Sequence, residues 1–329
     1  MNKKITILVP CYNEEESLPM LYAELTIIAD TLPSYSWEFL FVNDGSKDHT
    51  IDLIKGLRRN DTRVCYVDLT RNFGKENAML AGFDYATGDC MIIMDADLQD
   101  PPSLIPEMVR YWEEGYEDVY AKRIDRGKES WLRKRFSLLF YSILQKSSRF
   151  DVLKNVGDFR LLDRVCIEAL KQIRETDRYT KGMFAWIGYR KKEITFNRGD
   201  RIKGQSNWNF FSLLNLAIEG ITSFTTAPLR FSTIFGAIVS ISAFLYSLYF
   251  LIKTIIWGDS VQGFPTLIIV ILFLGGIQLI SLGIIGEYLG HIFHETKRRP
   301  TYLAREYNDK KVVLNGRNFH LPNNDHQSS

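Results

Sequence analysis

Four short apolar runs are separated by longer amphipathic stretches in the first hundred residues. Residues 5–9, 37–42, 64–69 and 90–94 are apolar and rich in β-branched or aromatic side chains, which predicts buried strands. Helix patterns lie between them: one is expected through Leu57, capped by Ser46 or Asp48, and another from Lys75 to Ala86. Strands that alternate with helices predict an α/β domain with a mostly parallel sheet and helices on both faces.

Two much longer apolar stretches follow near the end of the chain. Residues 231–256 carry one charge, Lys253, and residues 264–285 carry none, so each is long enough for the ~20 residues that a membrane span needs. The turn between them holds no Lys or Arg, whereas Arg230 and the Lys297–Arg299 triplet flank the pair. This charge pattern predicts a two-helix transmembrane hairpin with both ends in the cytoplasm. The alternative is a pair of buried core helices.

Composition narrows the class of protein. A formal net charge of +2 does not favour nucleic acid as a partner. The four cysteines form no C-x-x-C pair, so they are expected to be reduced and structural rather than zinc ligands. The first apolar run is too short for a signal-peptide core. We therefore expect a cytoplasmic catalytic domain at 1–228 with interfacial helices, a hairpin at 229–290, and a cytoplasmic tail at 291–329, in a multi-pass protein of the cytoplasmic membrane.

Polar loops follow three of the predicted strands. Ligands of parallel α/β sheets bind at the carboxyl ends of strands, where residues 12–14, 43–46 and 95–100 are expected to meet. Asp95 and Asp97, with Gln99 nearby, offer hard oxygen ligands for Mg²⁺ or Mn²⁺. Asp44 can accept hydrogen bonds from a pyrimidine or a ribose hydroxyl. The alternative is that both acidic segments are ordinary solvated turns.

Basic residues gather in two later segments. Arg123, Arg126 and Arg133 precede Ser137 in a stretch interleaved with Trp and Phe, which predicts an amphipathic helix on the bilayer surface. Its guanidinium groups could bind a lipid phosphate, or the helix could simply present a basic face to anionic headgroups. Arg201 lies in a loop that could close over a diphosphate.

Several motifs in this order resemble the family 2 glycosyltransferases of the dolichol-phosphate mannose synthase type. They are Pro10-x-Tyr12-Asn13-Glu14, Asn43-Asp44-Gly45-Ser46, Arg71-Asn72-Phe73-Gly74-Lys75, Asp95-Ala96-Asp97-Leu98-Gln99-Asp100-Pro101-Pro102, Gly157-Asp158-Phe159-Arg160-Leu161, Arg178-Tyr179-x-Lys181-Gly182, Trp186-x-Gly188 and Pro228-Leu229-Arg230. The bacterial polyprenyl-phosphate glucosyl and N-acetylglucosaminyl transferases look most similar. One departure is Asn207, where the family usually has Lys.

The resemblance implies a Rossmann-like GT-A domain and assigns roles to matching residues. The nucleotide-binding set is Pro10, Tyr12, Asn13, Glu14, Val42, Asp44, Asp95, Ala96, Arg123 and Arg201. The metal set is Asp95, Asp97 and Gln99, and the acceptor-phosphate set is Arg133, Ser137 and Arg126. Asp97 and Asp158 are the catalytic candidates. A lipid phosphate is mostly dianionic at pH 7, so Asp158 could orient rather than deprotonate it, or could simply pair with Arg160 or Arg178.

The expected activity is inverting transfer of a hexose or N-acetylhexosamine from a nucleotide diphosphate-sugar, UDP-glucose or UDP-GlcNAc, to polyprenyl (undecaprenyl) phosphate for cell-envelope glycosylation. The alternatives are a GDP-mannose-using mannose synthase and a membrane flippase subunit. A processive synthase is disfavoured because no Gln-x-x-Arg-Trp segment is present. Gly275, Gly276, Gly283 and Gly286 could allow close helix packing, which favours a homo-oligomer.

Overall fold

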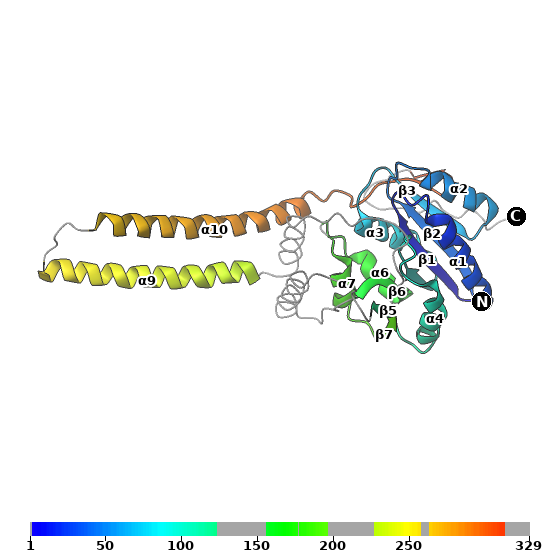
Figure 1. Cartoon of the computed structure of the whole chain (residues 1–329), viewed down its shortest axis with the longest axis horizontal. Helices are drawn as coiled ribbons and strands as arrows, with labels where there is room; N and C mark the ends of the chain where they lie inside the picture. Colours follow the sequence, from blue (N-terminus) through cyan, green and yellow to red (C-terminus); the bar gives the residue numbers. More distant parts are fainter. Residues whose placement is uncertain (1, 124–155, 177, 197–226, 258–262, 313–329) are drawn as a thin grey trace. The chain divides into compact units, whose positions relative to one another are not determined.

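A computed structural model describes residues 2–123, 156–176, 178–196, 227–257 and 263–312, and all structural statements concern these residues. The described chain divides into two compact units (Figure 1). The first contains a sheet with its helices and includes residues 299–312. The second contains two long helices. Each unit is described separately.

The first unit is built on a nine-stranded sheet with the order β7-β5-β6-β4-β1-β2-β3-β8-β9. The four strands predicted in the first hundred residues are present and mutually parallel: β1 (Lys4–Cys11), β2 (Ser36–Asn43), β3 (Val64–Leu69) and β4 (Cys90–Ile93). The others are β5 (Asp118–Arg123), β6 (Val156–Asp163), β7 (Lys191–Phe196), β8 (Ala304–Tyr307) and β9 (Lys310–Lys311).

The expectation of a mostly parallel sheet was wrong, because the sheet is mixed. β6 runs antiparallel to both β4 and β5, and β8 runs antiparallel to both β3 and β9. The middle of β6 is buried, as the parallel strands are. Burial of this kind reveals that a strand is internal but carries no information about its direction.

Helices cover both faces of the sheet (Figure 1). One face carries α1 (Leu18–Thr31), α2 (Thr50–Asn60), the 3₁₀ turn Pro102–Leu104 and α4 (Ile105–Glu113); the other carries α3 (Lys75–Tyr85), α6 (Arg164–Gln172) and α7 (Thr180–Trp186). Strand alternation explains the two cores: Ile5, Ile7 and Val9 of β1 face the first set, and Leu8 faces the second.

The start of α2 differs from the prediction. His49 is the N-cap residue, in place of Ser46 or Asp48. Asp48 still satisfies an N–H group of the first turn, because its Oδ1 accepts from Thr50 N at 3.1 Å. Ser46 is engaged elsewhere, since its Oγ accepts from the backbone N–H of Asn13 at 3.0 Å.

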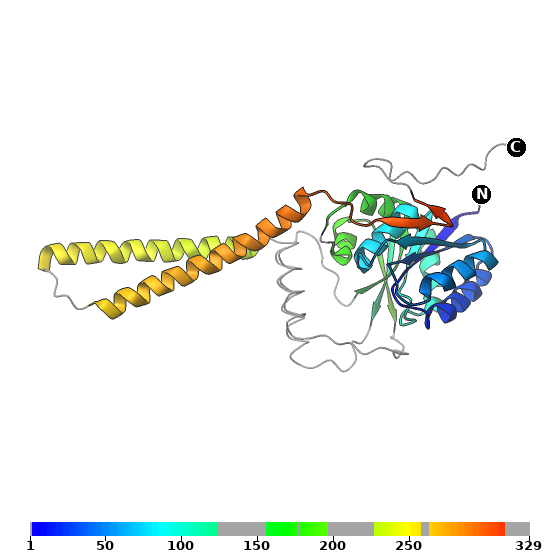
Figure 2. The ribbon, with the colours of Figure 1, turned by 90° about the horizontal axis from the view of Figure 1, so that it is seen from above.

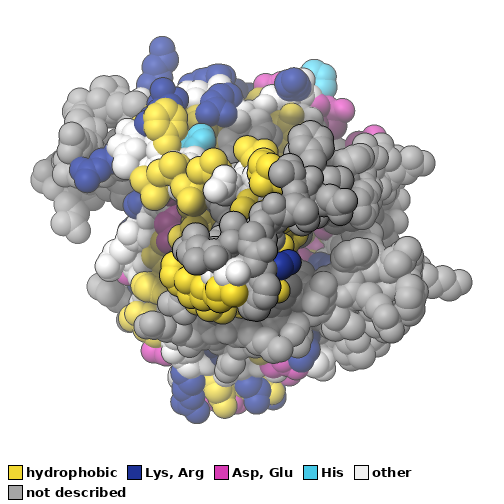
Figure 3. Space-filling model, turned by 90° about the vertical axis from the view of Figure 1, so that its left-hand side faces the viewer, with side chains coloured by type: hydrophobic (Ala, Val, Ile, Leu, Met, Phe, Trp, Pro, Cys, Tyr) yellow, Lys and Arg dark blue, Asp and Glu magenta, His cyan; other side chains and the backbone are white. Residues whose placement is uncertain are grey.

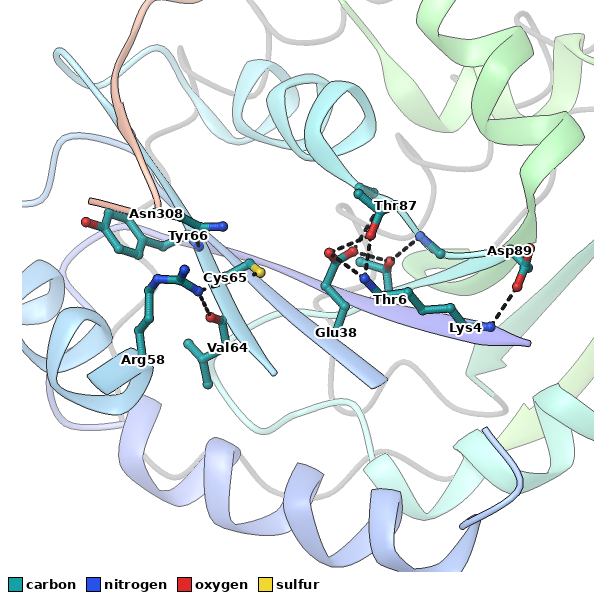
Figure 4. A network of polar contacts seen from close by, with 12 residues as sticks. Lys4, Thr6, Glu38, Arg58, Val64, Cys65, Tyr66, Thr87, Asp89 and Asn308 are labelled. Atoms are coloured by element: carbon teal, nitrogen blue, oxygen red, sulfur yellow. Dashed lines mark hydrogen bonds and ion pairs between the residues drawn. The ribbon is translucent and has the colours of Figure 1, made fainter. Parts of the chain in front are cut away.

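A buried polar network ties together the amino-terminal ends of β1 and β2 (Figure 4). The carboxylate of Glu38 accepts from Thr6 Oγ1 at 2.6 Å, and from the backbone N–H and the hydroxyl of Thr87 at 3.0 and 2.7 Å. Lys4 Nζ lies 3.2 Å from the same carboxylate. Burial would raise the pKa of Glu38, but these hydrogen bonds and the Lys4 charge outweigh burial and lower it.

The chain returns to the sheet after the second long helix. β8 pairs with the edge of β3, where Thr70 N donates to Leu303 O at 2.9 Å (Figure 2). Tyr302 is fully buried and donates its hydroxyl to Asp84 Oδ2 at 2.6 Å. The sequence analysis placed this segment in a tail and predicted no strand there.

The second unit consists of α9 (Ala227–Trp257) and α10 (Phe264–Thr296), which lie side by side (Figures 1 and 2). The hydroxyls of Ser232 and Ser281 are 2.9 Å apart across the pair. Many apolar side chains are exposed, for example Phe244 at 68% and Leu279 at 71%. Hydrophobic side chains gather over the helices at the centre of Figure 3. An exposed apolar surface of this kind is typical of a site that contacts a membrane or another protein.

The two-span prediction is not confirmed. In the described chain, one segment, Phe273–Thr296, is long and apolar enough to cross a membrane, and the apolar stretch Ser232–Tyr246 of α9 is shorter. A Cβ added at Gly275, Gly276, Gly283 or Gly286 would meet no described atom within 4 Å. Homo-oligomer formation through these small faces stays a prediction.

Candidate functional site

A cleft of about 260 Å³ lies at the carboxyl ends of the central parallel strands. The three predicted loops meet there. The end of β1 and the loop after it supply Pro10, Cys11, Tyr12 and Glu14, the loop after β2 supplies Asp44, and the loop after β4 supplies Asp95, Ala96 and Asp97. A fourth segment, at the start of α3, adds Asn72, Gly74, Lys75 and Ala78. Convergence of the three loops was therefore predicted correctly. The sequence did not predict that the start of α3 forms one wall of the cleft, which is called the α3 wall below.

The loops after β1 and β2 are bonded to each other. Asn13 adopts a left-handed conformation with φ of 57°. Its side-chain oxygen accepts from Lys47 N at 2.8 Å, and Glu14 N donates to Thr50 Oγ1 at 2.8 Å. Asn13 thus holds the two loops together and does not line the cleft, while Tyr12 lines it with 41% of its surface exposed.

Asp44 joins the β2 loop to the α3 wall. Its two carboxylate oxygens accept from the backbone N–H groups of Phe73 at 2.7 Å and Gly74 at 2.9 Å. Burial raises the pKa of Asp44 despite these hydrogen bonds. A carboxylate can accept about four hydrogen bonds, so Asp44 retains capacity for a ligand. Val42, which was assigned to the nucleotide, is fully buried in the core and does not line the cleft.

Gly45 makes that junction possible. Its φ is +64°, and an added Cβ would lie 2.4 Å from the backbone carbon of Arg71. The loops after β2 and β3 therefore touch backbone to backbone, which only a residue without a side chain permits.

The acids after β4 present oxygen atoms suited to a divalent cation. Asp95 and Asp97 line the cleft and are partly exposed. Gln99 is buried and does not line the cleft, and its side-chain oxygen has no hydrogen-bond partner among the described residues. Leu98, between Asp97 and Gln99, has a φ of 57°, which is an uncommon conformation for a non-glycine residue. The described chain contains no cluster of three or more His, Cys, Asp or Glu arranged for a metal. Two carboxylates plus an amide oxygen nevertheless fit Mg²⁺ or Mn²⁺, which commonly take few protein ligands.

Lys75 bridges two of the predicted site acids. Its Nζ lies 2.5 Å from Asp95 Oδ1 and 2.6 Å from Asp158 Oδ2. Burial would lower the pKa of Lys75, but the charges of Asp95 and Asp158 raise it above its ordinary value. The sequence analysis quoted Lys75 within a motif and gave it no role.

Asp158 on β6 is buried, with one carboxylate oxygen on Lys75 and the other without a described hydrogen-bond partner. Burial would raise its pKa, but Lys75 and Lys181 outweigh burial and lower it. The suggested pairing with Arg160 or Arg178 was wrong. Asp158 and Arg160 are two residues apart on β6, so their side chains point to the same face of the strand. Arg160 nevertheless pairs with the buried Asp118 of the neighbouring β5 at 3.1 Å, and Asp158 pairs with Lys75.

Arg123, assigned to the donor phosphates, is the last residue of β5, so its placement in an amphipathic helix was wrong, and it does not line the cleft. Its Nη2 is 3.4 Å from Asp100 Oδ1, and its Nε has no described partner. Burial, together with the charge of Asp95, raises the pKa of Asp100 to about 6, against the opposing effect of Arg123. The remaining predicted residues, Arg126, Arg133, Ser137, Arg201 and Asn207, lie outside the described residues, as do the interfacial helices and the diphosphate loop.

Comparison with known proteins places the chain in a family. The model of the family described as Glycosyl transferase family 2 matches residues 6–171. The prophage bactoprenol glucosyl transferase homolog of Escherichia coli strain K12 is 43% identical and covers 92% of this chain and 98% of its own length. The bactoprenol glucosyl transferase of Shigella phage SfX is also 43% identical, covering 92% and 99%.

Solved structures show a more distant likeness. Glucosyl-3-phosphoglycerate synthase from Mycobacterium tuberculosis, in a complex with Mn²⁺, UDP-glucose and phosphoglyceric acid, is 19% identical with a TM-score of 0.42, covering 66% of this chain and 76% of its own. Mannosyl-3-phosphoglycerate synthase from Rubrobacter xylanophilus is 16% identical with a TM-score of 0.43, covering 66% and 71%. The family match and the near full-length relatives decide the assignment: the chain is a glycosyltransferase with a GT-A Rossmann-like fold and belongs to glycosyltransferase family 2.

Proposed function

We propose that this glycosyltransferase moves glucose from UDP-glucose to polyprenyl phosphate at the cytoplasmic face of a membrane. One observation carries the proposal: an acidic cleft at the carboxyl ends of β1, β2 and β4 occurs in a chain that matches bactoprenol glucosyl transferases over nearly its whole length. The exposed apolar surface of α9 and α10 supports a lipid substrate, and a two-pass hairpin with both termini in the cytoplasm remains part of the proposal.

The cleft residues divide into a nucleotide part and a diphosphate part. Tyr12 is exposed at the rim, where its ring can stack on a base, and Asp44 has free acceptor capacity for a base N–H or ribose hydroxyl. Asp95, Asp97 and Gln99 would hold Mg²⁺ or Mn²⁺. When bound, such an ion neutralises charge that develops on the departing nucleoside diphosphate.

The reaction is a single inverting displacement. A phosphate oxygen of the lipid attacks the anomeric carbon, the bond from that carbon to the diphosphate breaks, and UDP leaves with the electron pair. The attacking phosphate is largely dianionic at pH 7, because its second pKa is about 6. Asp158, whose pKa is lowered and which is already paired with Lys75, is therefore a positioning group and not an obligatory base.

A transfer assay tests the proposal and its alternatives. Purified protein in detergent would be incubated with polyprenyl phosphate, Mn²⁺ or Mg²⁺, and radiolabelled UDP-glucose, UDP-GlcNAc or GDP-mannose in separate reactions, followed by lipid extraction. We expect label in the lipid phase with UDP-glucose, and its loss in the Asp97→Ala variant. Transfer from GDP-mannose alone would favour the mannose synthase, and label that stays in water with every donor would refute glycolipid synthesis.

A further inference from the structure

The cleft holds an unusual balance of charge. Its described lining contains four acidic residues, Glu14, Asp44, Asp95 and Asp97, and one basic residue, Lys75. Burial raises the pKa of Glu14, and the charges of Asp97 and Asp95 raise it further. The one ammonium in the lining is therefore placed where negative charge is concentrated.

The position of Lys75 on its helix suggests a role in the site. Lys75 is the first residue of α3, directly after the N-cap Gly74. The amino end of a helix carries partial positive charge, so a lysine there is electrostatically unfavourable. The contacts at 2.5 Å to Asp95 and 2.6 Å to Asp158 compensate for this.

We infer that Lys75 is an internal cation that occupies Asp95 in the metal-free protein and gives up this carboxylate when a divalent ion and the donor diphosphate bind. The inference rests on the proposed metal site. Lys75 and the ion compete for Asp95, while the contact with Asp158 involves a different acid and can persist. An ammonium has three N–H donors, so the donor that leaves Asp95 becomes available to a diphosphate oxygen.

Competition of this kind makes metal and nucleotide binding cooperative. Without nucleotide, the ion must displace Lys75 and enter beside a positive charge, which weakens its binding. With nucleotide, the diphosphate supplies negative charge to both cations. Lys75 thus disfavours a metal bound alone and favours the complete metal–donor complex, and the two ligands must assist each other equally because linkage is reciprocal.

Direct Mn²⁺ binding, followed by electron paramagnetic resonance with and without UDP, tests this without relying on turnover. In Lys75→Met, Mn²⁺ binding without UDP should tighten by about tenfold or more, since a unit charge a few ångströms away is removed. The improvement that UDP gives to Mn²⁺ binding should shrink correspondingly. Lys75→Arg keeps the charge and should behave like the unsubstituted protein in the absence of UDP.

Lys55→Met is the matched control, because Lys55 also pairs with a carboxylate, Glu306 at 3.0 Å, but does not line the cleft. Its Mn²⁺ binding should be unchanged. If Lys75→Met does not fold because Asp158 loses its partner, the double variant Lys75→Met/Asp158→Asn removes both charges and should still bind Mn²⁺ more tightly.

The outcomes separate the two proposals. Unchanged or weaker Mn²⁺ binding in the folded Lys75 variants, beside measurable binding by the unsubstituted protein, overturns the role of Lys75 alone. Absence of Mn²⁺ binding in every protein, with or without UDP, overturns the metal site and this inference together. The inference is supported if Mn²⁺ binding tightens in the variants with Lys75→Met and stays unchanged in Lys75→Arg and Lys55→Met.

Discussion

Replacing Gly45 by Ala tests how the cleft is assembled. The residue has a φ of +64°, which disfavours an L side chain by about 1–2 kcal/mol. The added Cβ would also lie 2.4 Å from the Arg71 carbonyl carbon and 2.6 Å from Asn72 N, so backbone must move. Overpacking of this kind adds roughly 1–3 kcal/mol. We therefore expect Gly45→Ala to lower the free energy of unfolding by about 2–5 kcal/mol in total.

The same substitution should also weaken catalysis, because Asn72 lines the cleft and Asp44 bonds to the following Phe73 and Gly74. A displaced wall misplaces the donor, and misplacement by about 1 Å can lower kcat/KM by about 100-fold. Thermal unfolding in detergent and donor kinetics measure the two effects. At ~2–4 °C per kcal/mol, the unfolding midpoint should fall by about 4–20 °C.

Gly56→Ala is a control with the opposite expected sign. Gly56 lies within α2, and an added Cβ would meet no described atom within 4 Å. Ala is preferred to Gly inside a helix by about 0.5–1 kcal/mol, so this variant should unfold at a slightly higher temperature. If Gly45→Ala retained both the unfolding midpoint and the donor KM of the unsubstituted protein, the close approach of the two loops would be refuted.

Three further substitutions test other parts of the structure. Asp97→Ala should lower kcat by roughly 10²–10³-fold or more in the lipid transfer assay with little change in unfolding temperature, whereas activity near the original level would exclude Asp97 from the chemistry. Glu38 has a folded pKa below its unfolded value of about 4.3, so its stabilisation is present above that pH and is lost as the pH falls through the folded pKa. The unfolding midpoint of Glu38→Gln should therefore depend less on pH below about 4.3 than that of the unsubstituted protein. Parallel curves of unfolding midpoint against pH for the two proteins would contradict this. Arg160→Ala leaves the buried Asp118 carboxylate without its ion-pair partner and should lower the free energy of unfolding, measured by chemical denaturation, by about 3–5 kcal/mol. The double variant Arg160→Met/Asp118→Leu should recover this stability if the unpaired charge is the cause.

The central strands and their loops were predictable because both follow from local pattern. Apolar runs defined β1 to β4, and parallel topology brought their polar carboxyl-terminal loops together. The Lys75–Asp158 contact joins residues 83 positions apart, and no local spacing reports it. β8 is four residues long and only partly buried, so it lacks the apolar run by which the other strands were found.

Carboxylates at the two ends of the central strands have opposite effects on the stability of the fold. At the amino-terminal edge, the carboxylate of Glu38 has hydroxyl, amide and ammonium partners, and its pKa is lowered. At the carboxyl-terminal edge, acids crowd one another, and burial and mutual repulsion raise the pKa of Glu14 and Asp100. A compensated carboxylate stabilises the fold, whereas crowded and partly exposed carboxylates destabilise it until a cation arrives. Lys75 relieves part of this repulsion with a charge that stays attached to the chain, and because it is flexible it can leave Asp95 without unfolding α3. The cleft can therefore persist before its ligands bind and still bind a divalent ion with the donor.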